Sequence, residues 1–264
     1  MNADLHLDAP ATFNEKLQWL KLYDRKPVYT GMVDKLLVRD HIAETIGGEY
    51  LIPLLDAWDR PEDIDFDALP NQFVLKCNHN SGLGMCICKD KSKLDLKKVK
   101  RELHRGLRQD YYLTGREWPY QNVSRKIIAE TFLSDESGTL TDYKIHNFNG
   151  VPKLILVCRD RFTSGGLTED FFDETWTPLD LSRPNIGKAQ TTPIKPPELE
   201  RMLELSKKLS AGIPFLRTDF YVVRGKVYFG ELTFFPAGGF TPFVPEVWDQ
   251  TLGDWLTLPE HSAL

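Results

Sequence analysis

The chain has 264 residues, of which 41% are hydrophobic and 27% are charged, so it is long enough for one large domain or two lobes with a sizeable core. A formal net charge of −5 excludes an overall electrostatic attraction to nucleic acid or to an anionic membrane. For this reason we expect no nucleic-acid partner. No apolar run approaches the length of a membrane-spanning helix, so we also expect no transmembrane segment. The four cysteines lack the paired C-x-x-C spacing of a zinc site. We therefore expect reduced, buried thiols in a cytoplasmic protein.

The first predicted elements are helices. Apolar residues at helical spacing follow Thr12, and Glu15 stands three positions after it, so a helix capped by Thr12 is expected over residues 13–20. A second helix is expected over residues 34–46, where a pair of glycines ends the helical pattern. Residues 50–58 predict an extended segment.

A hairpin with a glycine-rich tip follows. Residues 72–77 predict a short buried strand, residues 85–89 predict the returning strand, and the polar loop between them contains Gly82 and Gly84. Leucine and valine side chains at helical spacing then predict an amphipathic helix over residues 95–107, whose lysines and arginines face solvent.

The second half of the chain alternates between hairpins and helices. We expect a strand over residues 127–133, followed by a hairpin of residues 142–148 and 153–159. An irregular segment over residues 165–197 and a helix over residues 198–210 come next. A last hairpin is expected over residues 217–223 and 226–233. Consecutive hairpins with helices between them favour antiparallel sheets and an α+β fold over an alternating parallel one.

The last hairpin carries an acidic residue on each strand, Asp219 and Glu231. Pairing about the Arg224-Gly225 turn places position 219 opposite position 230, so Glu231 falls beside Asp219 within one residue of register. Two carboxylates in an apolar sheet repel each other unless a cation lies between them, and Mg²⁺ takes carboxylate oxygens while keeping sites open for phosphates. The other interpretation is an ordinary solvent face on which acids alternate with buried residues.

A lysine before the glycine loop suggests a phosphate site. Lys76 closes a strand just before residues 78–84, and its ammonium and the N–H groups of the loop can surround a phosphate chain. The spacing is neither that of a P-loop nor that of a Rossmann fingerprint. The alternative is an ordinary hairpin tip.

A third group lies on the predicted hairpin of residues 142–159. Asp142 and Lys144 share one strand face and Arg159 lies on the returning strand, so an acid for ribose hydroxyls stands near bases for phosphates. The alternative is a surface ion pair, which contributes little stability. His146 continues the same face, and a hydrogen-bonded structural histidine is the simpler interpretation there.

The order of these pieces resembles a known family. In chain order the pieces are Val33-Asp34-Lys35, Phe73-Val74-Leu75-Lys76, the glycine loop, residues 127–133, Asp142-Tyr143-Lys144, Arg217-Thr218-Asp219 and Glu231-Leu232-Thr233. They resemble the ATP-grasp superfamily, and most closely its TupA-like branch, which is named for teichuronopeptide biosynthesis. The resemblance runs from Phe13 to the region of Trp255.

The resemblance implies an α+β ATP-grasp fold, in which two lobes of antiparallel sheet plus helices clasp ATP. It implies an N-terminal helical segment of residues 1–30, a smaller lobe of residues 31–130, and a larger lobe of residues 131–264 that contains the metal site. Because Lys35 occurs so early, we expect the N-terminal substrate domain of many such ligases to be lacking.

The resemblance also implies roles for individual residues. The implied ATP contacts are phosphate contacts from Lys35, Lys76 and Lys144, a loop over the phosphates with Ser81, Gly82 and Gly84, adenine contacts at Glu130, Phe132 and Leu133, and a ribose contact from Asp142. The implied catalytic residues, which neutralise the γ-phosphate, are Lys144, Arg159 and Arg217. The implied metal ligands are Asp219, Glu231 and Thr233. The family usually has Asn where Thr233 stands, so the number of Mg²⁺ ions, one or two, stays open.

By this resemblance the chain is an ATP-dependent carboxylate–amine ligase that forms an amide through an acyl phosphate. The carboxylate is expected to be a uronic acid of a capsule-type glycan or an amino acid, and an association with glycan-assembly enzymes is implied. Three alternatives remain. They are a sugar kinase of the same fold with His146 or Asp160 as base, a non-catalytic polyanion- or glycan-binding module that uses the basic helix, and a two-carboxylate glycosidase, which leaves the lysines and the glycine loop unexplained.

Overall fold

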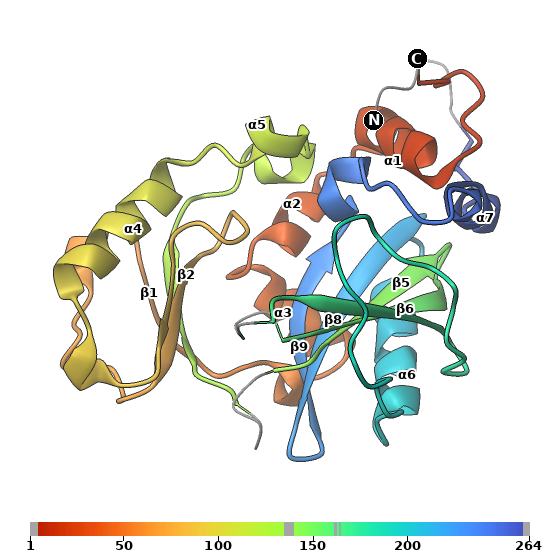
Figure 1. Ribbon diagram of the computed structural model, residues 1–264. Helices are drawn as coiled ribbons and strands as arrows, with labels where there is room; N and C mark the ends of the chain where they lie inside the picture. The colour runs from red at the N-terminus through yellow and green to blue at the C-terminus, as the bar shows by residue number, and fades with distance from the viewer. Residues whose placement is uncertain (1–4, 135–139, 161–162, 164, 261–264) are drawn as a thin grey trace.

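Two antiparallel sheets form the framework of the molecule (Figure 1), as the succession of hairpins predicts. The computed structural model describes residues 5–134, 140–160, 163 and 165–260. The first sheet has the order β1-β4-β2-β3, with β1 (Leu54–Trp58), β2 (Phe73–Cys77), β3 (Met85–Cys88) and β4 (Ile127–Thr131). The second sheet has the order β7-β6-β5-β8-β9, with β5 (Asp142–Phe148), β6 (Val151–Arg159), β7 (Thr168–Asp173), β8 (Phe215–Val223) and β9 (Lys226–Thr233).

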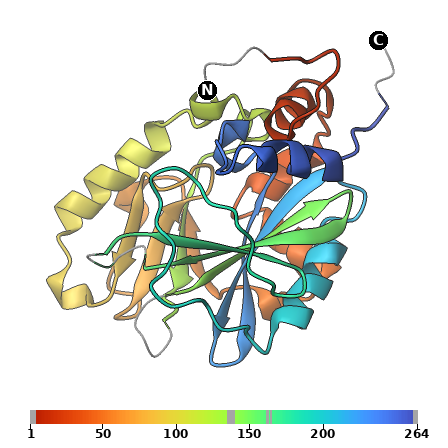
Figure 2. The same ribbon diagram turned by 45° about the vertical axis from the view of Figure 1, so that its right-hand side comes forward.

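Helices cover the outer sides of the two sheets. In both views α4 (Leu96–Arg108) lies on the side of the first sheet that faces away from the second, whereas α6 (Leu199–Leu209) packs on the second sheet (Figures 1 and 2). The remaining α-helices are α1 (Phe13–Tyr23), α2 (Val28–Val33), α3 (Val38–Thr45), α5 (Tyr112–Gly115) and α7 (Val247–Trp255). Among the residues described, no helix has the length and apolar character needed to cross a membrane.

Each sheet has its own apolar core. The smaller core joins the first sheet to α4, with Phe73, Leu75 and Leu103 fully buried. The larger core joins the second sheet to the helices of residues 13–45 as well as to α6 and α7. The apolar contacts therefore tie the N-terminal helices to the second sheet, while the division of the chain at residues 30 and 130 stays a prediction.

Local signals explain where the predicted helices begin. Thr12 accepts a hydrogen bond from the Glu15 amide at 3.3 Å, and the Glu15 carboxylate accepts one from the Thr12 amide at 3.0 Å, so the predicted capping box of α1 is confirmed. In α4 the Asp95 side chain accepts from the Lys98 amide at 3.0 Å. One buried stripe of α4, with Val99 and Leu103, then packs on the first sheet.

The helix predicted over residues 34–46 is wrong at its start. Residues 28–33 form the separate helix α2, and α3 begins at Val38. The Asp34 carboxylate accepts hydrogen bonds from the Leu36 amide at 2.8 Å and from the Asn78 side chain at 2.8 Å. This side chain therefore makes a turn and ties it to the glycine loop, in place of continuing the helix.

The irregular segment predicted over residues 165–197 contains a strand. Residues 168–173 form β7, which pairs with β6 along its whole length. The sequence pattern does not predict this strand, because its acidic and aromatic residues stand in blocks instead of alternating. The extended segment predicted over residues 50–58 is a strand only from Leu54 onward.

Candidate functional site

Asp219 and Glu231 lie directly opposite each other on β8 and β9. The hairpin turn alone predicts position 230 as the partner of position 219. A β-bulge between Asp219 and Phe220 shifts the pairing by one residue and brings Glu231 into register instead. Gly230 stands beside this bulge, where an added Cβ would approach the Asp219 carbonyl oxygen to 3.1 Å. The two acids are therefore direct neighbours, one residue away from the predicted register.

Both carboxylates face the same side of the sheet, because one guanidinium contacts them both. In Arg217, Nε lies 2.7 Å from Oδ1 of Asp219, and Nη2 lies 2.7 Å from its Oδ2. The same Nη2 lies 3.0 Å from Oε1 of Glu231. The Thr233 hydroxyl donates to that Oε1 at 3.3 Å, so the third predicted metal residue adjoins the pair.

Lys144 completes this charged cluster from the neighbouring strand β5. It stands opposite Asp219 in the register, donates a hydrogen bond to its carboxylate, and lies 3.7 Å from Oδ2 of Asp142. Burial opposes the charge on Asp219, but Arg217 and Lys144 outweigh it and hold the pKa of this carboxyl below its usual value. Burial likewise opposes the charge on Lys144, and Asp219 raises the pKa of this ammonium in spite of it.

The donor set of the cluster fits Mg²⁺. Asp219 and Glu231 supply two carboxylates and Thr233 a hydroxyl, all hard oxygen donors. Within the described parts of the chain, no group of three or more His, Cys, Asp or Glu side chains is placed to hold a metal. A site with two carboxylates suits Mg²⁺, which usually takes one or two from the protein and the rest from water and phosphates.

A pocket next to this cluster is lined by residues of both sheets. Its lining residues are Lys35, Val38, Arg39, Leu51, Ile52, Lys76, Glu130, Phe229 and Gly230. Phe229 and Gly230 immediately precede Glu231 on β9, so the pocket adjoins the acidic pair. Burial lowers the pKa of Lys35, an effect opposed by Glu231 and reinforced by Lys76, and its ammonium donates to the Asn80 carbonyl at 2.7 Å.

An ion-pair chain crosses the first-sheet side of this pocket. The Lys76 ammonium lies 2.5 Å from Oε2 of Glu130, and Arg39 lies 3.3 Å from Oε1. These ion pairs bring together Lys76 and Glu130, to which the family resemblance assigns phosphate and adenine contacts. The pocket therefore combines apolar walls with three cations and one carboxylate, a lining that suits a base attached to an anionic chain.

The predicted glycine loop has one exposed and one packed end. Ser81 and Gly82 are exposed, and a side chain at Gly82 would meet no atom within 4 Å. Gly84 packs against α4, where a Cβ would lie 2.7 Å from the Gly106 Cα and 2.8 Å from the Cys77 sulfur. Both glycines have a positive φ. Gly84 therefore has a packing requirement of its own, independent of any ligand.

Three predicted residues lie apart from the charged cluster. Phe132 and Leu133 follow the end of β4, where the chain leaves the first sheet. Arg159 donates to the Thr191 carbonyl at 2.5 Å and lies 3.8 Å from Asp170, so its contacts are with β7 and with the segment that follows β7.

Two residues with site contacts escape prediction from the sequence. Arg39 lies on α3 and reaches Glu130 across a separation of 91 residues. Glu117 exposes only 6% of its surface, and burial raises the pKa of its carboxyl to about 7, with the charge of Glu231 reinforcing the shift and Lys21 and Arg217 opposing it. No local motif marks either position, because both depend on contacts between distant segments.

Comparison with solved structures finds similar folds at low sequence identity. D-alanine–D-alanine ligase from Helicobacter pylori aligns with a TM-score of 0.49 and 14% identity, over 94% of this chain and 70% of that one. The same enzyme from Bacillus anthracis, complexed with ATP, gives 0.44 and 18% over 76% of this chain and 53% of that one. The ATP-grasp ligase PsnB, with Mg and ADP, gives 0.45 and 11% over 79% of this chain and 52% of that one. The chain thus spans about half the length of the last two proteins.

The sequence comparison is more decisive. Among curated proteins none matches the chain. Residues 15–257 match the protein family described as TupA-like ATPgrasp, a range that begins within α1, includes both sheets and ends after α7. The chain therefore belongs to the TupA-like ATP-grasp family, and its two antiparallel sheets with their helices form an ATP-grasp fold.

Proposed function

We propose that the chain is an ATP-dependent ligase that joins a carboxylate to an amine. The observation that carries the proposal is the acidic pair Asp219 and Glu231, held on one sheet face together with Arg217 and Lys144. Two carboxylates and two fixed cations at one place suit a metal-bound phosphate chain better than a neutral ligand. Membership of the ATP-grasp family supports the same assignment.

ATP would bind between the two sheets, with the predicted residues in the predicted roles. Its phosphates would be held by Lys35 and Lys76 under the loop of Ser81, Gly82 and Gly84. Its adenine would lie at the pocket that Glu130 lines, next to the backbone of Phe132 and Leu133, and Asp142 would hold the ribose. The nucleotide would thus lie between the predicted smaller lobe, residues 31–130, and the predicted larger lobe, residues 131–264. The predicted helical segment of residues 1–30 would not contact it.

The metal would be held by Asp219 and Glu231, with Thr233 beside them. Mg²⁺ at this position would supply positive charge to the phosphate oxygens. Thr233 supplies a hydroxyl where an amide or a third carboxylate would be a stronger ligand. One Mg²⁺ ion would therefore have two carboxylate ligands, whereas a second ion would depend on phosphate and water ligands.

The proposed reaction has two steps. A carboxylate oxygen of the first substrate attacks the γ-phosphorus, the bond from phosphorus to the bridging oxygen breaks, and its electron pair leaves with ADP. The amine nitrogen then attacks the acyl carbon, the C–O bond to phosphate breaks, and the amine proton ends on hydrogen phosphate. Arg217 and Lys144 would stabilise the charge on the transferring oxygens. Arg159, which contacts Asp170, would assist only from the edge of the site.

The carboxylate would be an amino acid or a uronic acid of a capsule-type glycan, and the acceptor an amine. The TupA-like membership supports a role in surface-polysaccharide assembly, in which the chain would work in the cytoplasm beside glycan-assembly enzymes. This finer assignment depends on family likeness, because the same site geometry serves any carboxylate.

The alternative functions find less support in the structure. A sugar kinase needs a base, but burial, with Arg217 and Arg183, lowers the pKa of His146 to about 3, which makes it a weak base near neutral pH. A glycan-binding module needs exposed aromatic rings, but Trp118 exposes only 8% of its surface and Tyr111 packs against Tyr120 with centroids 4.8 Å apart.

ADP release tests the proposal. Purified protein with Mg·ATP should release ADP only when a carboxylate and an amine are both present, and mass spectrometry should detect an amide together with phosphate. A stable phosphorylated sugar would indicate a kinase instead. ADP release without any dependence on either substrate would contradict the ligase proposal.

Variants connect the activity to the site. Asp219→Asn should reduce ADP release about a thousandfold, whereas the control Glu174→Gln, at an exposed acid just after β7, should behave like the wild type. Equal losses in the two variants would mean that the acidic pair has no special role.

A further inference from the structure

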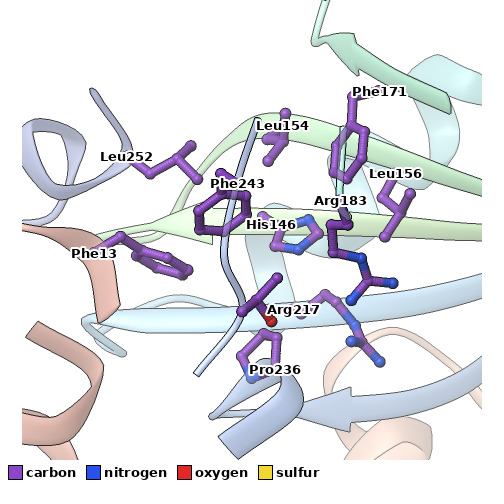
Figure 3. Close-up of a pocket in the computed structure, with 11 residues that line it drawn as sticks. Phe13, His146, Leu154, Leu156, Phe171, Arg183, Arg217, Pro236, Phe243 and Leu252 are labelled. Atoms are coloured by element: carbon purple, nitrogen blue, oxygen red, sulfur yellow. The ribbon is translucent and has the colours of Figure 1, made fainter. Parts of the chain in front are cut away.

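A narrow cavity lies next to Arg217, against the second sheet and the helices α1 and α7 (Figure 3). Its apolar wall includes Phe13 of α1, Leu154 of β6 and Leu252 of α7. These three side chains expose 3%, 1% and 1% of their surface. The walls are closely packed at this end, so a large apolar group does not fit there.

Two polar atoms of the lining residues have no hydrogen-bond partner among the residues described. They are Nδ1 of His146 and Oγ1 of Thr241. The two residues expose only 7% and 8% of their surface, so bulk water does not solvate them. Buried polar groups in proteins are nearly always paired, and an unpaired one costs free energy. Both atoms are therefore suited to a partner that enters the cavity.

The remaining polar lining is positively charged. Arg183 is held by the buried carboxylate of Glu169, with Nε 2.6 Å from Oε2, and Arg217 is held by Asp219. These bonds fix each guanidinium but use only part of its five N–H donors. No acidic side chain of the described chain lines the cavity itself, but both guanidinium groups are ion-paired behind it, Arg183 with Glu169 and Arg217 with Asp219. An incoming anion would therefore share these two cations with the carboxylates and bind the N–H donors that they leave free.

The cavity has an apolar end and a cationic end. Figure 3 shows Phe13 and Leu252 on one side of the His146 ring, and the guanidinium groups of Arg183 and Arg217 on the other. His146 is neutral, because burial together with Arg217 and Arg183 lowers its pKa to about 3. A neutral imidazole can donate or accept one hydrogen bond without adding charge.

We propose that this cavity binds the carboxylate substrate of the ligase, and that this substrate is a small α-amino or α-hydroxy acid with a short apolar side chain. The inference rests on the proposed function. The carboxylate would lie at the guanidinium groups, the α-substituent at His146 and Thr241, and the apolar side chain against Phe13 and its neighbours. A uronic acid fits less well, since its ring hydroxyls would lose water against apolar walls.

The position of Arg217 connects the cavity to the proposed chemistry. Its guanidinium lines the cavity and also contacts Asp219 and Glu231. An acid bound at this guanidinium would present a carboxylate oxygen beside the metal-binding pair, where the proposed first step needs it. The acceptor amine would then reach the acyl carbon from outside the cavity, so the amine is free to be large.

Isothermal titration calorimetry tests the inference on the full chain in the presence of Mg²⁺ and AMP-PNP. The probes are alanine, lactate, phenylalanine and glucuronate. Alanine or lactate should bind, and phenylalanine and glucuronate should bind at least about tenfold more weakly, since one is too large and the other too polar for the walls. ADP release with ATP should follow the same order of preference.

A nearly isosteric variant tests the polar contact. Thr241→Val removes only the hydroxyl and should raise the KM for the small acid about tenfold, with the KM for ATP unchanged. Thr192→Val, at an exposed position, is the matched control and should change neither constant. A role of Thr241 in packing alone would not separate the two KM values.

Three outcomes would overturn this inference alone. A preference for glucuronate over alanine, or an unchanged KM in Thr241→Val, would do so and leave the ligase proposal intact. A crystal structure grown with AMP-PNP and alanine that shows only ordered water between His146 and Thr241 would do the same. Failure to bind AMP-PNP would contradict the proposed function and this inference together.

Discussion

The two sheets present their candidate site residues in different ways. On the second sheet, Asp219 exposes 1% of its surface, and its carboxylate is bonded to both Arg217 and Lys144. On the first sheet, Ser81 and Gly82 are exposed at the tip of a hairpin, and space around Gly82 is open. One region is fixed by buried charge pairs, whereas the tip of the other is exposed to solvent.

The difference suits two tasks of the proposed ligase. A buried and fully paired cluster keeps its geometry while charge develops, so stabilisation of the transferring phosphoryl group needs no reorganisation. An exposed loop can change its conformation over bound phosphates and exclude water from a reactive acyl phosphate. Gly84 marks the boundary, because it is packed against Gly106 while Gly82, two residues earlier, is not.

The largest expected effect separates the two acids of the buried cluster. Asp219→Asn removes the buried carboxylate that Arg217 and Lys144 share and leaves them only Glu231 and Asp142. The free energy of unfolding should therefore fall by about 3–5 kcal/mol, as for a buried ion pair that loses one partner. Glu231 is 33% exposed in its side chain, and Glu231→Gln should cost at most about 1 kcal/mol. Both variants should lose about a thousandfold in ADP release. Urea denaturation and ADP assays measure the two quantities, and equal destabilisation would break the contrast.

The next effect tests the boundary of the glycine loop. In Gly84→Ala the new Cβ would lie 2.7 Å from the Gly106 Cα at a φ of +71°, so the free energy of unfolding should fall by about 2–4 kcal/mol. In Gly82→Ala the new Cβ would meet no neighbour, and only the strain of an alanine at a φ of +83° remains. The free energy of unfolding should therefore fall by about 1–2 kcal/mol. Thermal unfolding of both variants measures this. Equal losses would show that Gly84 is not an anchor.

A smaller effect is expected on the first-sheet side of the nucleotide pocket. Lys76→Met removes a cation proposed to contact phosphate, and it leaves Glu130 with Arg39 as its remaining partner. The Kd for Mg·AMP-PNP should rise about 10- to 100-fold, equivalent to about 1.4–2.7 kcal/mol. Calorimetry measures the Kd. Lys97→Met on α4, at an exposed position, should leave it unchanged.

The smallest effect is a pH dependence at Glu117. Its pKa is about 7 in the folded protein against 4.5 in an unperturbed carboxyl, so the folded state holds the proton more tightly than the unfolded state. Between those pH values the free energy of unfolding therefore falls as pH rises. Glu117→Gln should remove this fall, an effect on the order of 1–2 kcal/mol.

Urea denaturation near pH 5 and near pH 7 measures that change. The advantage of Glu117→Gln over the wild type should grow with pH, whereas the exposed control Glu174→Gln should follow the wild type. A constant difference across the range would show that Glu117 does not keep its proton on folding.

Elements encoded by near neighbours in the chain are predictable from the sequence. The hairpin of β8 and β9 closes over a two-residue turn, so alternation and turn residues place Asp219 beside Glu231 to within one position. The missing position is a β-bulge, which depends on the fit of Gly230 against the neighbouring strand. The capping box of α1 is predictable for the same local reason.

Features that need distant segments to meet are not predictable in this way. Arg39 reaches Glu130 across 91 residues, and the cavity draws its walls from α1, β6 and α7. Strand β7 lacks alternation and is set by its pairing with β6. In each case tertiary contacts decide the structure, and no short window of the sequence contains them.

The double contact of Arg217 couples two compartments. One guanidinium is shared by the acidic pair and the cavity, so a ligand that pulls it toward either side changes the electrostatic field on the other. If the bound metal and nucleotide change the affinity for the proposed small acid by some factor, the acid must change the affinity for the nucleotide by the same factor. Such a coupling between the two proposed ligands would run through a single shared side chain.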